Sequence, residues 1–163
     1  MNKEVFSPLD RVRTFVKRFD PSLEPMVFDE PMKTSEEAAQ MLGVEVGQIA
    51  KSILFRTRER YGLFVAAGDV RIHTRQVKAC LGGGQPKMAS PEEVLSITGF
   101  EVGAVCPFAL REEVPVYIDE SLRRFPVVYT AAGIAESLLP VSFEQLVEIT
   151  GGTVINAASE EGN

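Results

Sequence analysis

The chain of 163 residues contains no tryptophan, a single histidine (His73) and two cysteines (Cys80 and Cys106). Zinc sites built from histidine and cysteine need several such ligands at short, paired spacings, which these three residues do not provide. The sequence therefore predicts no metal and no cofactor. Two cysteines in a chain of this length do not form a disulfide framework, which indicates free thiols in a reducing, cytoplasmic setting.

Long apolar segments are also missing. No run approaches the roughly 20 apolar residues that a helix needs to cross a bilayer. The first segment, MNKEVFSPLDRVRTF, lacks the apolar region of a signal peptide. We therefore expect no membrane association. Hydrophobic residues make up 45% of the sequence and charged residues 25%, as in ordinary soluble domains. The length suits a single domain, which we assign to residues 1–157, followed by a polar tail at 158–163.

The net charge of −6 argues against general nucleic-acid affinity, but the charges are unevenly distributed. The segment from Lys51 to Lys87 holds eight basic and two acidic residues, a local charge of +6, so the remainder of the chain carries −12. Two interpretations are equally open. The segment forms one basic surface for a polyanion, with Arg56, Arg58 and Arg75 as candidate tRNA contacts, or its charges are simply solvated on the outside of strands and helices.

Helices and strands are mixed along the sequence. Apolar residues at helical spacing, polar caps and following glycines predict helices near residues 5–19, 35–42, 74–81, 91–97 and 143–150. Runs rich in branched and aromatic residues predict strands near residues 26–28, 48–55, 61–67, 114–119, 126–130, 136–141 and 154–155. Because several strands follow one another without helices between them, the order favours an α+β fold over a doubly wound parallel sheet. We expect a mixed α/β sheet that curls toward a barrel.

The stretch from Thr34 to Phe55 carries the strongest local signals. Thr34 and Glu37 have the spacing of a capping box, Gly43 is the expected helix stop, and a strand follows. Lys51 lies inside that apolar strand, where an ammonium is costly to desolvate without a partner. The pattern alone favours an edge-strand lysine whose ammonium reaches water. The alternative is a lysine at the floor of a pocket, where it meets an anion.

Two motifs together suggest a family. The segment Gly47–Phe55, GQIAKSILF, follows the helix and its glycine, and the segment Thr98–Pro107, TGFEVGAVCP, ends in a Gly-x-x-x-Pro element. With Gly68-Asp69 between them, they resemble the YbaK family, the stand-alone relatives of the editing insertion domain of prolyl-tRNA synthetase. The resemblance runs from about residue 26 to residue 157. It implies a curved, barrel-like mixed sheet surrounded by helices. It also implies a trans-acting hydrolase that deacylates mischarged aminoacyl-tRNA, with mischarged tRNA and an aminoacyl-tRNA synthetase as partners.

The resemblance further implies roles for individual residues. Lys51 matches the essential lysine of the family and would anchor the terminal adenosine of the tRNA, while a positioned water attacks the ester. The loop from Gly103 to Pro107 would contact the ester through its backbone. The other residues expected to line the site are Ser52, Ala104, Val105, Cys106, Ala131 and Gly133. Asp69 is expected to have a structural role in its turn.

The sequence departs from the family pattern at three places. Cys106 replaces a common serine, His73 replaces an aspartate or asparagine, and residues 131–133 replace a more polar run. The first departure permits another hypothesis, a cysteine hydrolase with His73 as its base. No feature of the sequence brings the two side chains together, so a buried or semi-buried free thiol is favoured. A further alternative is a non-catalytic module that binds aminoacyl-tRNA or serves a synthetase as an accessory.

Overall fold

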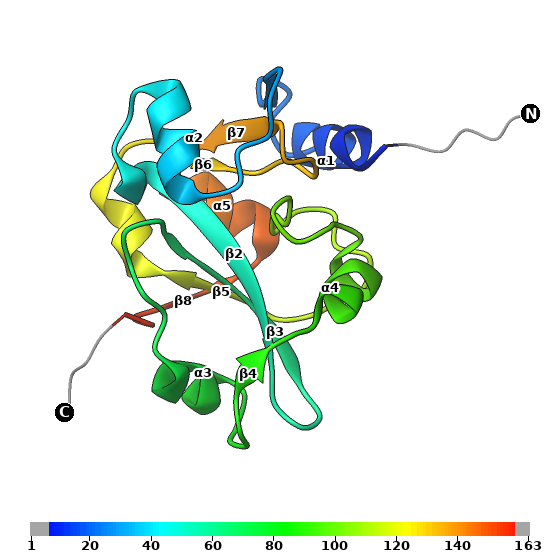
Figure 1. The fold of residues 1–163 in the computed structure, drawn as a ribbon, viewed down its shortest axis with the longest axis vertical. Coiled ribbons are helices and arrows are strands. Elements are labelled where there is room, and N and C mark those ends of the chain that lie inside the picture. The colour runs from blue at the N-terminus through cyan, green and yellow to red at the C-terminus, as the bar shows by residue number, and fades with distance from the viewer. Residues whose placement is uncertain (1–6, 159–163) are drawn as a thin grey trace, which may run out of the picture.

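The computed structural model describes residues 7–158 (Figure 1). The start of the predicted first helix and the predicted tail beyond residue 158 lie outside the described residues. The helices are α1 (Pro8–Lys17), α2 (Ser35–Leu42), α3 (Thr74–Cys80), α4 (Pro91–Thr98) and α5 (Phe143–Thr150), with 3-10 turns η1 (Val46–Gln48) and η2 (Glu120–Arg124). The strands are β1 (Met26–Val27), β2 (Ile49–Arg56), β3 (Tyr61–Ala67), β4 (Lys87–Met88), β5 (Val116–Asp119), β6 (Val128–Thr130), β7 (Ser137–Val141) and β8 (Thr153–Ile155).

The strands form one mixed sheet in the order β1-β7-β6-β2-β3-β5-β8, with β4 paired to β2. Three pairs are parallel, namely β2–β6, β3–β5 and β5–β8, and the other pairs are antiparallel. The predicted mixed α/β sheet with surrounding helices is therefore confirmed. The strand β2 lies between β3 and β6 in the sheet, so it is not the edge strand that the pattern favoured, although its pairing with β6 stops at Ala50, just before Lys51.

Side chains alternate between the two faces of the sheet, and each face is covered by different helices. On the first face, Leu54, Val65 and Ile118 belong to the main core, which includes apolar residues of α1, α4 and α5. On the second face, Ile49 packs with residues of α2, and Phe55 packs with residues of α3. The two helices α2 and α3 lie toward opposite ends of β2 (Figure 1).

Local hydrogen bonds set the limits of the helices. Thr34 Oγ1 accepts a hydrogen bond from the backbone N–H of Glu37 at 3.0 Å, and Gly43 ends α2 with a φ of 71°, as predicted. A complete capping box would also have the Glu37 carboxylate accept a hydrogen bond from the backbone N–H of Thr34. The carboxylate instead accepts from the backbone N–H of Lys33 at 2.7 Å. A complete capping box starts α4 at Ser90.

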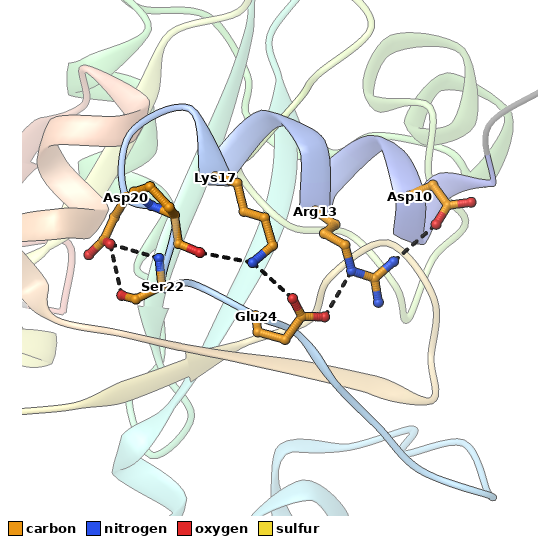
Figure 2. Close-up of polar contacts among 7 residues, drawn as sticks. Asp10, Arg13, Lys17, Asp20, Ser22 and Glu24 are labelled. Atoms are coloured by element: carbon orange, nitrogen blue, oxygen red, sulfur yellow. Dashed lines mark hydrogen bonds and ion pairs between the residues drawn. The ribbon is translucent and has the colours of Figure 1, made fainter.

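Polar contacts fix α1 against the segment that leads into β1 (Figure 2). The Glu24 carboxylate accepts from Arg13 Nε at 2.9 Å and lies 2.9 Å from Lys17 Nζ. Asp20, just after the helix, accepts from the side-chain amide of Gln145 in α5 at 2.9 Å. These contacts hold the outer face of α1, while its inner face meets the core and the loop that follows α4.

Candidate functional site

A gap in the strand pairing of β2 marks the candidate site. One edge of β2 pairs with β3 along almost its whole length. The other edge pairs with β6 only at Ile49 and Ala50, and with β4 only at Phe55 and Arg56. Among the described residues, positions 51–53 have no strand partner on this second edge, whereas the carbonyl of Leu54 accepts a hydrogen bond from the backbone N–H of Ala89 at 2.9 Å. Such an edge exposes backbone groups that another segment or a ligand can approach.

A cavity of about 140 Å³ opens at this gap. Its walls come from β2, from the loop after α4, from the turn before β7 and from the N-terminal end of α2. The lining residues are Met32, Lys33, Thr34, Ser35, Ala38, Ile49, Ala50, Lys51, Ser52, Gly103, Val105, Ala131, Ala135, Ser137 and Leu138. Most of the lining residues are therefore apolar, and the others are two lysines, three serines and a threonine. A mainly apolar lining with a few polar groups is the usual composition of a small-ligand site.

Lys51 is half-buried in the cavity wall. Its Nζ donates a hydrogen bond to the backbone carbonyl of Val70 at 2.5 Å. Burial lowers the pKa of the Lys51 ammonium, and the nearby carboxylates of Glu36 and Asp69 oppose that effect. An ammonium carries three donors, so the bond to Val70 orients the group and leaves donors for a ligand.

Ser52 is the neighbour of Lys51 in β2, and it also lines the cavity. Its Oγ is buried and has no hydrogen-bond partner within residues 7–158. Buried hydroxyls in proteins are nearly always hydrogen-bonded, and those that are not call for an explanation. The Ser52 hydroxyl is shielded from the cavity, so a ligand would reach it only after a shift of the surrounding side chains.

The glycine-rich loop after α4 faces β2 across the cavity. Gly103 has a φ of 95°, which disfavours any residue with a side chain, and a Cβ built there would meet nothing within 4 Å. The glycine is therefore required by the backbone conformation and leaves open space beside it. Gly103 and Val105 line the cavity, whereas Ala104 and Cys106 are buried on the core side. The loop thus divides its residues between the cavity and the protein interior.

Arg11 of α1 holds both ends of this loop. Its guanidinium donates to the carbonyl of Ala109 at 3.2 Å and to the carbonyl of Thr98 at 3.0 Å, and it lies 4.5 Å from the centroid of the Phe100 ring. Sequence reasoning missed Arg11, because an arginine on the polar side of an amphipathic helix carries no signal of a contact 87 or 98 residues away. Arg11 is a candidate positioning residue for the cavity wall.

The structure brings together five of the residues that the sequence nominated for the site, namely Lys51, Ser52, Gly103, Val105 and Ala131. Ala104, Cys106 and Pro107 are buried and do not line the cavity. Gly133 is also buried, and a Cβ at this position would lie 2.8 Å from the backbone oxygen of Pro8, so it permits close packing of α1. Lining residues that sequence reasoning missed include Met32, Ala38 and Leu138, whose apolar character does not distinguish them from core residues.

Cys106 is fully buried, and burial raises the pKa of its thiol to about 12. Its Sγ lies 3.8 Å from the carbonyl of Phe108. His73 lies elsewhere, at the N-terminal end of α3, with its backbone N–H bonded to the carbonyl of Ala157. A thiol without access to solvent and with a raised pKa is a poor nucleophile. The geometry therefore argues against the cysteine-hydrolase alternative.

None of the three nominated arginines lines the cavity. Arg56 pairs with the Glu93 carboxylate of α4, and its guanidinium also donates to Tyr61 Oη at 3.1 Å. Arg58 is exposed in the β2–β3 turn, and Arg75 is exposed on α3. Arg56 therefore links β2 to α4, and a charge reversal there would place two carboxylates together.

The contacts of Glu93 predict a pH-dependent stability. Bonds from Tyr61 Oη at 2.6 Å and from the backbone N–H of Ser90 at 2.8 Å, together with Arg56, lower the pKa of Glu93 from 4.5 to about 2. A carboxyl with a depressed pKa in the folded state stabilises fully above pH 4.5 and loses that contribution as the pH falls toward 2. Glu93→Gln is expected to have a lower Tm than wild type at neutral pH. The Tm values of the two proteins should converge as the pH falls toward 2.

Thermal melts between pH 2 and pH 7 measure this effect, and Glu92→Gln is the matched control. Glu92 is the exposed neighbour of Glu93, and its side chain makes no hydrogen bond or ion pair among the described residues. The control should leave the Tm close to the wild-type value throughout. A constant difference in Tm between wild type and Glu93→Gln over the whole range would contradict the assigned contacts.

Two other classes of site receive no support from residues 7–158. No group of three or more histidine, cysteine, aspartate or glutamate side chains in this part of the chain is arranged to hold a metal ion. In the same range, none of the helices combines the length and the apolar character that a bilayer span requires.

The model of the aminoacyl-tRNA editing domain matches residues 29–149. The uncharacterized protein YwhH of Bacillus subtilis (strain 168) is 37% identical over 143 residues, which cover 87% of this chain and 90% of that protein. Proline–tRNA ligase of Thermotoga maritima is 36% identical over 92 residues, which cover 56% of this chain but only 16% of the ligase. A solved structure described as a proposed trans-editing enzyme for prolyl-tRNA synthetase superposes with a TM-score of 0.88 at 30% identity, covering 96% of this chain and 99% of the other. The chain belongs to the aminoacyl-tRNA editing domain family, which is the YbaK-type family that its two motifs resemble.

Proposed function

We propose that the protein hydrolyses the ester bond of mischarged aminoacyl-tRNA in trans, and that residues 1–157 act as one editing domain. The observation that carries the proposal is the cavity at the gap in β2, which Lys51, Ser52 and Gly103 line together. Membership of the editing-domain family supports the reaction class. The partners would be a mischarged tRNA and an aminoacyl-tRNA synthetase, both of the cytoplasm.

The size of the cavity indicates which part of the substrate it could hold. Pockets that enclose drug-sized ligands have volumes of roughly 300–1,000 Å³, whereas this cavity holds about 140 Å³. It suits an aminoacyl group and leaves no room for a nucleoside. The terminal adenosine would therefore lie outside the cavity, on the side of Lys51.

An aminoacyl ester is already activated, so hydrolysis needs a positioned water and a stabilised oxyanion more than it needs a protein nucleophile. Lys51 would hold a phosphate or the ribose of the terminal adenosine as a compact charge. The backbone N–H groups of Gly103 and Val105 would face the ester, where they can stabilise the developing negative charge. The N–H of Ala104 already donates to the carbonyl of Glu101 at 2.9 Å. After a shift of the surrounding side chains, Ser52 Oγ would bond to the substrate or to the attacking water.

Cys106→Ser is expected to retain the deacylation rate of the wild type within a factor of a few, because the buried thiol neither attacks the ester nor lines the cavity. The choice of amino acid should also be unchanged, in contrast to the role in the amino-acid pocket that the sequence suggested. Rates on two mischarged tRNAs, together with a melting curve, test this expectation. A folded but inactive variant, or a trapped acyl-cysteine, would contradict it.

The competing function is a non-catalytic module that binds aminoacyl-tRNA or assists a synthetase. The experiment that separates the two incubates excess protein with a panel of mischarged tRNAs and follows release of the free amino acid. A hydrolase shortens the lifetime of at least one ester well below its spontaneous value. A binding module leaves all lifetimes unchanged or prolongs them.

A further inference from the structure

A second hollow adjoins the cavity along the second face of β2. This groove has a volume of about 560 Å³ and includes Lys51, Ile53 and Phe55 in its floor. Residues 51, 53 and 55 point to the same face because side chains alternate along a strand. Lys51 lines both the cavity and the groove, so the two hollows meet at this residue. Its ammonium binds the carbonyl of Val70, which also lines the groove.

The floor is open because the two helices on this face cover only the ends of β2. Ile49 packs with residues of α2, and Phe55 and the partly buried Ile53 pack with residues of α3, which leaves Lys51 between them. Glu36 of α2 and Thr74 of α3 form opposite walls. The far end carries Met88, whose side chain belongs to the short strand β4 and is 63% exposed.

Positive charge dominates the groove. Three cations, Lys51, Arg71 and Lys87, line it together with two carboxylates, Glu36 and Asp69. Asp69 is already neutralised, because its carboxylate binds the guanidinium of Arg124 at 2.8 and 3.1 Å. Within residues 7–158, the side chains of Arg71 and Lys87 make no hydrogen bond or ion pair. Two exposed cations are therefore available to an anionic ligand beside an apolar floor.

The length of the groove can be obtained from the number of residues of β2 along its floor. Met88 lies opposite Phe55 in the β2–β4 pairing, four positions along β2 from Lys51, which corresponds to ~13 Å at about 3.3 Å per residue. Lys87 precedes Met88 and lines the end of the groove. Stacked nucleotides advance by about 3.4 Å each along one strand. The groove is thus long enough for several nucleotides.

We propose that this groove binds the unpaired 3′ end of a tRNA, with the nucleotides that precede the terminal adenosine lying along β2 toward β4. The inference rests on the proposed function, which brings the ester to the cavity and the adenosine to Lys51. Phosphates would contact Arg71 and Lys87, and the faces of unpaired bases would pack on Ile53, Ile72 and Met88. Proteins that bind single-stranded nucleic acid combine a positively charged groove with flat side chains, usually aromatic, on which bases stack. In this groove aliphatic side chains would take that place.

The test uses two RNA minihelices that carry no amino acid, one with a 3′ CCA overhang and one with a blunt end. Their binding is measured with wild type and with the double variant Arg71→Glu/Lys87→Glu. Wild type should prefer the overhang probe by at least tenfold, and the variant should reduce the ratio of the two Kd values to about one. Because each phosphate contact of a single strand contributes about 0.7 to the log–log salt slope, the slope for the overhang probe should become less steep by about 1.4.

The matched control is Arg58→Glu/Lys78→Glu, which makes the same change of charge in the same basic segment but outside the groove. It should weaken both probes to a similar extent or leave both unchanged, so that the ratio of their Kd values is preserved. Melting curves verify that both double variants are folded. The proposal is overturned if wild type does not prefer the overhang, if the groove variant keeps the preference, or if the control loses it equally.

Because the probes carry no aminoacyl ester, the binding result does not depend on hydrolysis. Loss of the overhang preference in the groove variant, combined with no deacylation of any mischarged tRNA by wild type, would support the groove and contradict the proposed function. Deacylation by wild type, combined with an unchanged preference in the groove variant, would support the function and contradict the groove.

Discussion

Lys51→Ala is expected to abolish deacylation while the protein stays folded. The substitution removes the side chain that lines both the cavity and the groove and whose ammonium would position the terminal adenosine. A displacement of the ester by about 1 Å can reduce the rate on the order of 100-fold. The loss should therefore appear in the single-turnover rate constant of hydrolysis, measured with excess protein, more than in the affinity for tRNA.

The expected change in stability is small because two effects oppose each other. Removal of the half-buried ammonium relieves a desolvation cost, but it also deletes the hydrogen bond to the carbonyl of Val70. A typical hydrogen bond contributes about 1 kcal/mol net, so the free energy of unfolding should change by no more than about that amount. Thermal melts recorded beside the rate measurements show whether the variant is folded.

Two further substitutions at this position separate charge from shape. Lys51→Met keeps an unbranched apolar side chain and should be as inactive as Lys51→Ala. Lys51→Arg keeps the charge but should restore little activity, because a planar guanidinium does not replace a compact ammonium in a small cavity. Hydrolysis at a near-wild-type rate by folded Lys51→Ala would show that the ammonium has no part in the reaction.

Arg11→Ala is expected to lower both stability and turnover. The substitution leaves the carbonyls of Thr98 and Ala109 without the guanidinium that bonds to both. The carbonyl of Thr98 still accepts a hydrogen bond from the backbone N–H of Arg111 at 3.3 Å. Leaving the partly buried carbonyl of Ala109 unsatisfied costs about 1–3 kcal/mol. In a domain of this size each kcal/mol lowers the Tm by about 2–4 °C.

The same change should also disturb the wall of the cavity. Arg11 fixes the two ends of the loop that carries Gly103 and Val105. At temperatures well below the Tm, we expect the single-turnover rate constant of hydrolysis to fall on the order of 100-fold. The Kd for tRNA without an attached amino acid should be unchanged. Arg11→Lys should recover little, because an ammonium does not reach both carbonyls at once.

The matched control for Arg11 is Arg13→Ala on the same helix. Arg13 contacts Glu24 and Asp10 on the outer face of α1 (Figure 2). Exposed ion pairs contribute about 0.2–1 kcal/mol, so this variant should melt close to wild type and hydrolyse at the wild-type rate. Equal effects of the two substitutions on the rate would mean that α1 acts only through global stability.

Local features of the fold could be predicted from the sequence, and non-local ones could not. Thr34 and Gly43 mark the limits of α2 because caps depend on hydrogen bonds between residues close in sequence. The interior position of β2 depends on pairing with β6, which lies some eighty residues later. No periodicity in the segment around Lys51 reports that pairing, so pattern alone favoured an edge strand.

The candidate site shows the same division. The resemblance located Lys51, Ser52 and the Gly103 loop because their motifs are contiguous in the sequence. It did not show how the loop divides its residues between the cavity and the protein interior, so Cys106 was expected in the pocket although its side chain faces the core. The arginine clamp from α1 was missed because it joins segments far apart in the chain.

The most direct measurement follows free amino acid released by wild type from its preferred mischarged tRNA, with the tRNA in large molar excess over the protein. If the protein is a trans-acting hydrolase that works at the cavity beside Lys51, each molecule releases many equivalents of amino acid, and Lys51→Ala releases none above the spontaneous rate. Release of no more than one equivalent by wild type, or equal turnover by the two proteins, would contradict that mechanism.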